Sequence, residues 1–139
     1  KSNVSVTSIT GAKIAGMKCH VKGCIKDIAP DTIFIHHGTN ELSSERPSED
    51  IATDIANHAE SLKSKINRVF VSGLVIRTDQ FNKKREEVNE ILKKKCYEKE
   101  LNYIDNDNIT SKMLTSKGIH LNENGTVRLV NNFCSHANK

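Results

Sequence analysis

Two short stretches of the sequence, residues 32–35 and 69–76, are apolar almost without interruption. A strand has this composition when both of its faces are buried, whereas a strand with one wet face alternates apolar and polar residues. Strands buried on both faces are typical of parallel sheets that helices cover on each side. These two stretches therefore constrain the fold more than any other feature of the sequence.

Segments with helical periodicity alternate with the apolar stretches. Apolar residues recur in steps of three and four along the segments 11–28, 48–66, 80–99 and 123–136. Two further short strands are expected at 4–6 and 101–104. Strand and helix in alternation predict a parallel sheet with helices on both faces. The 139 residues suffice for one domain, which we place at 1–139.

The charge pattern narrows the possible partners. The formal net charge is +4, and lysines cluster at 83–84 and 93–95 with glutamates interleaved between them. Mixed charges at helical spacing are typical of a solvated helix face. Aromatic residues make up 4% of the chain and tryptophan is absent, so platforms for stacking bases are scarce. We therefore expect a solvated helix face, with a basic face that contacts nucleic acid as the alternative, and the sequence leaves the oligomeric state open.

The cysteines and the apolar stretches bear on metal binding and location. Cys19, His20 and Cys24 lie close together, but no second pair stands at zinc spacing, so we expect no metal site. Cys24, Cys96 and Cys134 fall in apolar helical patterns and are expected to be buried free thiols. No stretch has the length of a membrane span or the form of a signal peptide. We therefore expect no transmembrane segment and an intracellular location.

One polar motif, residues 36–41, follows the strand expected at 32–35. Functional groups of parallel sheets gather at such strand ends. Gly38 permits a tight turn, and the Asn40 amide can donate to a developing oxyanion. An ordinary turn is the alternative, because Gly-x-Asn is common in turns.

A second polar motif, residues 118–122, precedes the last helix. Asn122 is suited to cap that helix, and the cap would fix the loop that presents His120. A histidine held there can act as a general base, and an exposed loop histidine is the alternative. Gly11 begins the first helix, so its N–H can point at an anion, although alone it indicates only a helix start.

The order of three polar motifs resembles the sequence blocks of the SGNH (GDSL-type) hydrolases. These motifs are Gly11, Gly38-Thr39-Asn40 and Gly118-Ile119-His120-Leu121-Asn122. The likeness extends over nearly the whole chain, and it is nearest to the esterase-like domains of some retroelement-encoded and invertebrate proteins. It implies a three-layer α/β/α sandwich with a parallel, flavodoxin-like sheet, and hydrolysis of carboxylic esters. The implied roles are oxyanion donors for Gly11 and Asn40 and general base for His120. A small ester or acylated molecule would be the substrate, and no cofactor is implied.

The sequence departs from the family pattern in two places. It contains no Gly-Asp-Ser block, and neither Ser8 nor Ser72 matches the family's serine. Lys117 stands three residues before His120, where the family usually has an acid. Two aspartates after the fourth expected strand could take its place, namely Asp105 and Asp107.

We therefore expect a domain that lacks the first strand of the family fold and the serine block, and that is inactive as it stands. In the family this strand lies inside the sheet, so the strand at 32–35 would lack a neighbour or pair out of order with the strand at 4–6. The alternative function is a non-catalytic SGNH-like binding module or a degenerate retroelement-derived remnant.

Overall fold

The computed structural model describes residues 6–10, 32–37, 42–66, 68–116, 118 and 120–137. The helix expected at 11–28 lies outside the described residues. The sheet has the order β1-β2-β3-β4, with β1 at Val6–Thr10, β2 at Thr32–His37, β3 at Arg68–Ser72 and β4 at Asn102–Ile104. The helices described are α2 (Ser48–Lys63), α3 (Asn82–Glu98), α4 (Glu123–Ala137) and the short 3-10 helix η3 (Ser111–Met113).

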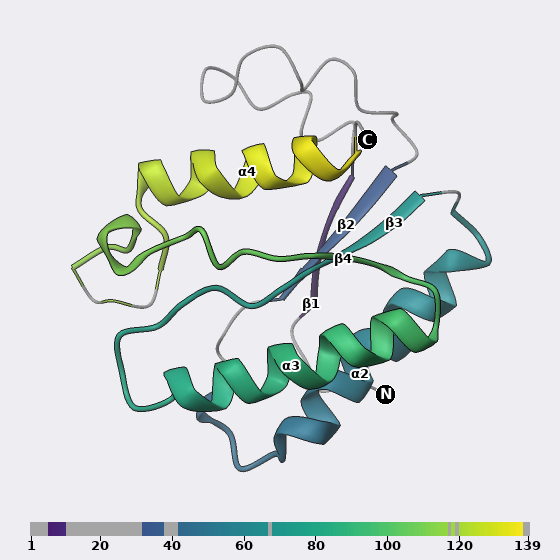
Figure 1. Ribbon diagram of the computed structural model, residues 1–139, viewed down its shortest axis with the longest axis horizontal. Helices are drawn as coiled ribbons and strands as arrows, with labels where there is room; N and C mark the ends of the chain where they lie inside the picture. Colours follow the sequence, from purple (N-terminus) through teal and green to yellow (C-terminus); the bar gives the residue numbers. More distant parts are fainter. Residues whose placement is uncertain are drawn as a thin grey trace.

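Helices cover both faces of the sheet, with α2 and α3 on one face and α4 on the other (Figure 1). Strands β2, β3 and β4 are parallel to one another. The predicted three-layer α/β/α class is therefore confirmed. The three described helices begin and end within a few residues of the predicted segments, because side-chain periodicity is a local property of the sequence.

The alternation of side chains along the strands divides the core into two halves. Ile35, Val69 and Val71 pack beneath α2 and α3. Phe34 and Phe70 point to the opposite face, where they pack beneath α4. The Phe34 ring lies 5.3 Å from Phe70 and 4.5 Å from Phe133 of α4, measured between centroids. These stacked rings fasten α4 to the sheet.

Strand β1 differs from the prediction in its bounds and its direction. It begins at Val6, whereas the expected strand covered 4–6. It pairs antiparallel with β2, with Val6 opposite His37 and Thr10 opposite Ile33. The pairing gives β2 a neighbour on both sides, as a strand buried on both faces requires. Of the two outcomes expected for the strand at 32–35, the structure shows the pairing with the first strand, and β1 departs from the all-parallel sheet by its antiparallel direction.

Strand β3 ends at Ser72, whereas the apolar pattern predicted a strand as far as Ile76. Leu74 and Val75 are buried as the pattern indicated, but their backbone leaves the sheet. Both backbone polar groups of Leu74 bond to the Asn89 side chain of α3, at 2.8 and 2.9 Å. The Asn89 side chain thus makes the two hydrogen bonds that a neighbouring strand would make to Leu74. The periodicity of the sequence does not indicate this substitution.

The two described cysteines differ in state. Cys96 on α3 is free and buried, as predicted. Cys134 on α4 is disulfide-bonded. The expectation of a free thiol is therefore wrong for Cys134, because helical periodicity reports burial and not pairing.

Candidate active site

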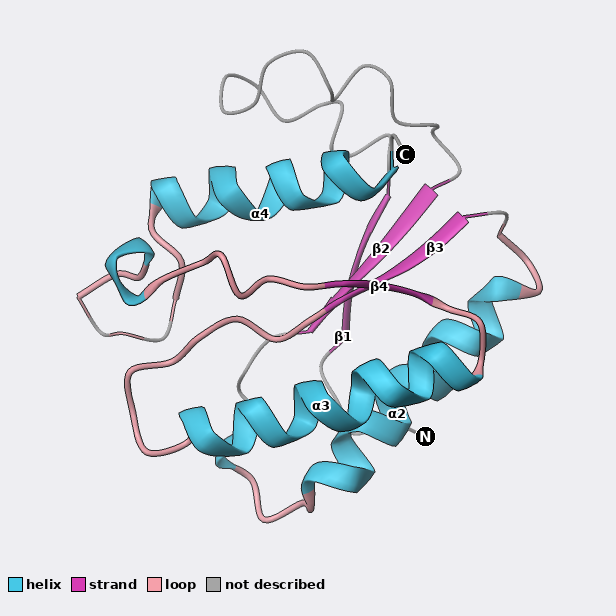
Figure 2. Cartoon of the chain, viewed as in Figure 1, coloured by secondary structure: helices cyan, strands magenta, loops and turns pink. Residues whose placement is uncertain are grey.

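The carboxyl ends of β2, β3 and β4 lie at one edge of the sheet, because the three strands are parallel. The segments that follow β3 and β4, and the first turns of α3 and α4, lie at this same end (Figure 2). In open α/β sheets this edge is where ligands bind. The predicted site residues were placed here by the same rule, so the described side chains at this edge form the candidate site.

A chain of polar side chains crosses this edge beneath α4. Asn132 of α4 donates to Asn106 (2.9 Å), and Asn106 donates to the Ser72 hydroxyl (2.7 Å). Ser72 lies 3.1 Å from Nδ1 of His36, near the end of β2. Asn108 extends the chain through a further bond to Asn132. Side chains from four separate segments thus hold the strand ends in fixed relative positions.

The hydrogen-bond roles within this chain follow from its chemistry. The Asn106 amide can only donate through Nδ2, so the Ser72 oxygen accepts from it. The Ser72 hydroxyl and Nδ1 of His36 form a further hydrogen bond, whose direction depends on the imidazole tautomer. Ser72 is 0% exposed, so no substrate reaches its oxygen. Ser72 therefore positions the strand ends, and the absence of a nucleophilic role agrees with its mismatch to the serine block.

His120 lies on the loop between η3 and α4, and its side chain is exposed. Leu114 and Leu121 pair across this loop, and the carbonyl of His120 accepts from the Thr115 amide at 2.7 Å. Asn122 accepts from the Gly125 amide at 2.9 Å. This is the predicted cap of α4, which fixes the end of the loop beside His120.

Gly118 ties this loop to the segment after β3. Its carbonyl accepts from the amide and the hydroxyl of Thr78, at 3.1 and 3.2 Å. Its φ of +71° is a left-handed conformation that glycine adopts without strain. A Cβ at this position would lie 1.8 Å from Oγ1 of Thr78, so a side chain does not fit. The contact places the His120 loop at the carboxyl edge of the sheet, where the sequence predicted it.

The other predicted residues are only partly placed. Gly11, Asn40 and Lys117 lie outside the described residues, and the role of Asn40 stays a prediction. Strand β1, which precedes Gly11, runs antiparallel to β2 and ends at Thr10 opposite Ile33, at the amino edge of the parallel strands. The expected oxyanion role of Gly11 beside His120 does not fit this direction of β1. Asp105 and Asp107 follow β4 and face α3, and no carboxylate within the described ranges contacts the His120 ring. Neither aspartate therefore takes the place of the missing acid in this arrangement.

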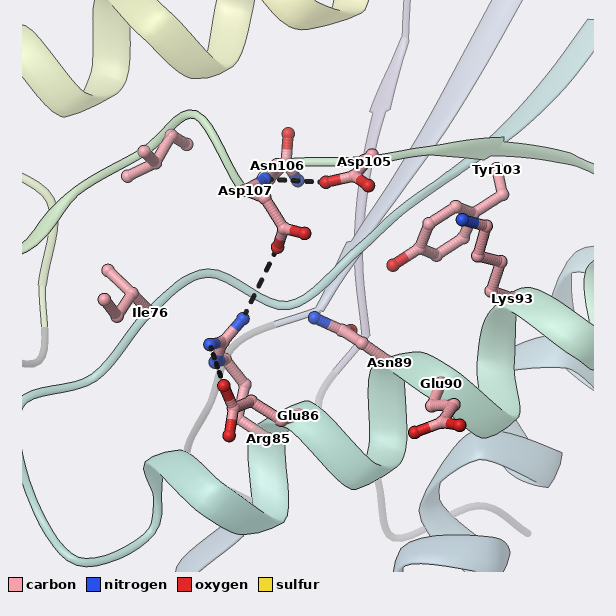
Figure 3. A pocket seen from close by; sticks show the side chains of 11 residues that line it. Ile76, Arg85, Glu86, Asn89, Glu90, Lys93, Tyr103, Asp105, Asn106 and Asp107 are labelled. Atoms are coloured by element: carbon pink, nitrogen blue, oxygen red, sulfur yellow. Dashed lines mark hydrogen bonds and ion pairs between the residues drawn. The ribbon is translucent and has the colours of Figure 1, made fainter.

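A cavity of about 440 Å³ opens at the same edge, between α3 and the segment after β4 (Figure 3). Its wall is mostly polar and comes from α3, from β4 with the residues that follow it, and from the end of the segment after β3. The lining residues used below are Arg85, Tyr103, Asp105, Asp107, Ile76 and Ile109. This cavity was not predictable from the sequence, because Arg85 stands in a charged helix whose mixed charges are typical of a solvated face.

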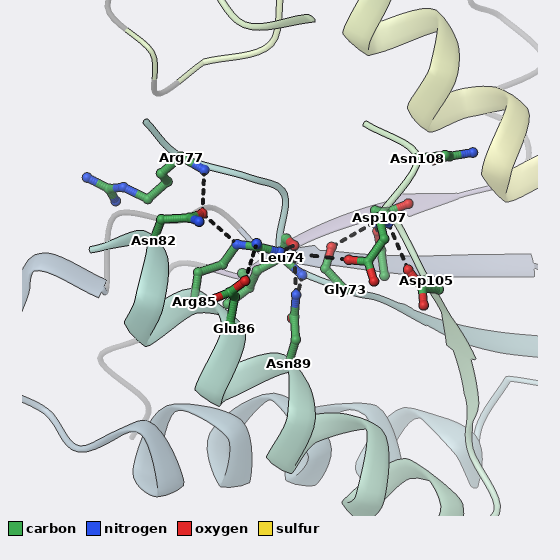
Figure 4. Close-up of polar contacts among 12 residues, drawn as sticks. Gly73, Leu74, Arg77, Asn82, Arg85, Glu86, Asn89, Asp105, Asp107 and Asn108 are labelled. Carbon is green, nitrogen blue, oxygen red and sulfur yellow. Dashed lines mark hydrogen bonds and ion pairs between the residues drawn. The ribbon is translucent and has the colours of Figure 1, made fainter. Parts of the chain in front are cut away.

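Arg85 occupies an unusual position for a charged residue of a surface helix. Its side chain is only 9% exposed, and its Nε donates to the Asn82 side chain at 2.9 Å (Figure 4). Nη1 lies 3.5 Å from the carbonyl of Leu74 and 3.9 Å from Asp107. Partial burial, followed by the negative charge of Asp105, raises the pKa of Asp107. The cavity therefore contains a buried cation beside a carboxyl whose ionised form is disfavoured.

In the described part of the chain, no helix combines the length and apolar character needed to cross a membrane. The same residues contain no group of three or more histidine, cysteine or acidic side chains arranged to hold a metal ion.

The layers and the polar carboxyl edge define an α/β/α protein of the flavodoxin-like class. Within this class, the chain has the fold of the SGNH (GDSL-type) hydrolases. It is similar to a GDSL-like lipase from Bacteroides thetaiotaomicron, with a TM-score of 0.69 and 13% identity over 78% of this chain and 62% of that one. It is also similar to a member of the lipolytic protein G-D-S-L family from Veillonella parvula, with a TM-score of 0.61 and 20% identity over 73% of this chain and 60% of that one.

A third similar structure is an alpha/beta hydrolase enzyme from the metagenome of Lake Arreo, Spain, with a TM-score of 0.66 and 12% identity. That match covers 94% of this chain and 68% of the other. The chain spans about three fifths of the length of the lipase and of the Veillonella protein. No family model matches the sequence, and neither does any curated protein.

Proposed function

We propose that this chain is the main part of an SGNH-type ester hydrolase domain, with His120 as general base and Asn40 as an oxyanion donor. The observation that carries the proposal is the place of the His120 loop. It is tied through Gly118 to the carboxyl edge of parallel strands, in a fold shared with GDSL-like lipases. The substrate would be a small carboxylic ester or an acylated molecule.

In such a reaction, the imidazole takes the proton of a serine hydroxyl while the serine oxygen attacks the ester carbonyl. The imidazolium then returns this proton to the leaving alcohol, which leaves an acyl-serine. Water, activated by the same imidazole, attacks this ester, so that the acid is released and the serine hydroxyl is regenerated. The amide of Asn40 would stabilise the negative charge that forms on the carbonyl oxygen. Because no carboxylate in the described residues contacts His120, the reaction would proceed with a serine–histidine pair and a lower rate than a triad gives.

The nucleophile in this proposal comes from a serine block outside the present chain. The sequence has no Gly-Asp-Ser, and the Ser72 hydroxyl is closed to substrate. The chain alone is therefore expected to be inactive. The second candidate function is a non-catalytic binding module with the same fold, or a degenerate remnant, and the missing block together with Lys117 at the acid position favours it.

Two assays separate these functions. The chain as given is incubated with a short-chain nitrophenyl ester and with a fluorophosphonate probe, and neither turnover nor labelling is expected. Turnover that is lost in His120→Ala would contradict the proposal, since it would place the nucleophile within this chain.

A longer form that carries the sequence preceding Lys1 is then assayed in the same way. The proposal expects labelling and turnover, with turnover falling by roughly a thousandfold or more in His120→Ala. The matched control is His58→Ala on α2, which should leave turnover unchanged. If the longer form is not labelled and does not turn over, the domain is a binding module or a remnant.

A further inference from the structure

The cavity between α3 and the segment after β4 brings together opposite charges that the fold leaves loosely paired. The carboxylate oxygens of Glu86 and Asp107 each lie 3.9 Å from the Arg85 guanidinium, which is beyond hydrogen-bond distance. Among the described residues, Nη2 of Arg85 makes no closer polar contact. A side chain that is nine-tenths buried thus retains donors that protein groups do not satisfy.

The side chains around the cavity converge on its centre. Figure 3 shows Arg85 and Asp107 on opposite walls, with the Tyr103 hydroxyl turned toward the space between them. Asp105 stands beside Asp107, and its carboxylate accepts from the Asp107 amide at 2.7 Å. The mutual repulsion of the two carboxylates would be relieved by a positive group placed against them.

A ligand with one charge does not suit this arrangement. An anion on Arg85 would also face Asp105 and Asp107, and a cation on the aspartates would leave the free donors of Arg85 without an acceptor. The other charged residues of the wall, Glu86, Glu90 and Lys93, all come from α3. A ligand with both charges places each one against its opposite. In an α-amino acid, the amino nitrogen and the nearer carboxylate oxygen are about 3 Å apart. This spacing is close to the 3.9 Å between Arg85 and Asp107. The ligand carboxylate can therefore lie against Arg85 while the ligand ammonium group lies against Asp107, so that each charge has only opposite charges as its nearest neighbours.

The rest of the wall indicates the side chain of such a ligand. Ile109 is buried, Ile76 is half-buried, and both line the cavity together with the Tyr103 ring. Apolar surface beside a few convergent polar groups is typical of small-molecule sites. The cavity lies at the carboxyl edge of the strands, where open α/β sheets bind ligands.

We propose that this cavity binds an α-amino acid with an apolar side chain, its carboxylate on Arg85 and its ammonium group on Asp105 and Asp107. This inference goes beyond the proposed hydrolase function and does not depend on it. Binding is therefore measured on the chain as given, without reference to turnover.

The test is a titration with L-leucine, followed through backbone amide NMR shifts. Two matched probes accompany it: isocaproate, which lacks the amino group, and isoamylamine, which lacks the carboxylate. L-leucine is expected to bind with a Kd of about 1 mM or tighter, and at least about tenfold more tightly than either probe. No shifts with L-leucine at about 10 mM, or equal binding of one probe, would overturn the proposal.

Variants locate the binding in the cavity. Asp107→Asn should weaken L-leucine binding about tenfold or more, and the carboxylate of Asp107 is 78% exposed, so the fold does not rely on it. Glu98→Gln removes the same charge from the end of α3, outside the cavity, and should bind L-leucine as the parent does. Equal affinity in Asp107→Asn and the parent would refute the site.

Discussion

The Asn89 side chain hydrogen-bonds both backbone polar groups of Leu74, accepting from the amide at 2.8 Å and donating to the carbonyl at 2.9 Å. These two bonds hold the segment after β3 against α3. We expect Asn89→Ala to lower the free energy of unfolding by about 1–3 kcal/mol, because it leaves the buried Leu74 amide without a partner, while the Leu74 carbonyl keeps the long contact with Arg85.

Chemical denaturation measures this effect of Asn89→Ala, with Asn124→Ala as control. Asn124 is an exposed asparagine in the first turn of α4, and its replacement should change stability by less than about 0.5 kcal/mol. Equal midpoints for the two variants would show that Asn89 does not support Leu74.

Gly118→Ala tests the tie between the segment after β3 and the His120 loop. The left-handed backbone costs about 1–2 kcal/mol for a residue with a Cβ, and the contact with Thr78 adds to this. We expect a lower thermal midpoint and a shifted NMR signal of the His120 ring. Adding Thr78→Ala removes the contact but not the backbone strain, so it should restore only part of the loss. An unchanged midpoint in Gly118→Ala would mean that residue 118 is not left-handed.

Glu100→Gly is expected to stabilise the domain by about 1 kcal/mol. Glu100 has a φ of 56°, which glycine adopts without cost. It ends α3 with two bonds, from Leu101 to the carbonyl of Cys96 (2.8 Å) and from Glu100 to that of Tyr97 (3.3 Å). Glu100→Ala keeps the strain and removes the carboxylate, so it serves as control and should change little. A glycine variant no more stable than the alanine variant would contradict this account of the helix end.

Because the Cys96 thiol is buried, we expect the free energy of unfolding to fall in alkaline solution. Burial raises its pKa from 9.0 to about 12. Below pH 9 the folded and unfolded chains both hold the proton, so this contribution is constant. Above pH 9 the unfolded chain releases the proton and the folded chain retains it. The free energy of unfolding therefore falls with rising pH, by up to about 1.4 kcal/mol per unit, until pH nears 12.

Comparison with Cys96→Ala isolates this effect. Urea unfolding of both proteins between about pH 8 and pH 10 should give a steeper fall for the parent than for the variant. Burial also raises the pKa of Tyr103, but this group is common to both proteins and cancels in the difference. Parallel profiles would show that Cys96 titrates at its ordinary value while the protein is folded.

The sequence was sufficient to predict features that depend on local pattern. Helical steps of three and four located α2, α3 and α4, and the cap motif located Asn122 beside His120. Features that depend on distant partners were not predictable. The end of β3 depends on Asn89, and the direction of β1 depends on which edge of β2 needs a partner.

The candidate site also has features that were predictable from the sequence and features that were not. The place of the His120 loop followed from the rule that functional groups gather at the carboxyl ends of parallel strands. The bonds of His36, Ser72 and Asn106 join residues more than thirty positions apart, so no spacing rule indicates them. The role of Asn40 stays a prediction, to be tested with the longer form of the protein, whereas the direction of β1 does not fit the role expected for Gly11.

The positions of the two tyrosines allow the cavity to be followed by tyrosine fluorescence. The chain has no tryptophan, so tyrosine dominates its ultraviolet emission. Tyr97 stands in solvent at 85% exposure, whereas Tyr103 is half-buried in the cavity wall. With Tyr97 replaced by Phe, the remaining fluorophore would be an intrinsic reporter whose emission changes when the cavity fills or opens.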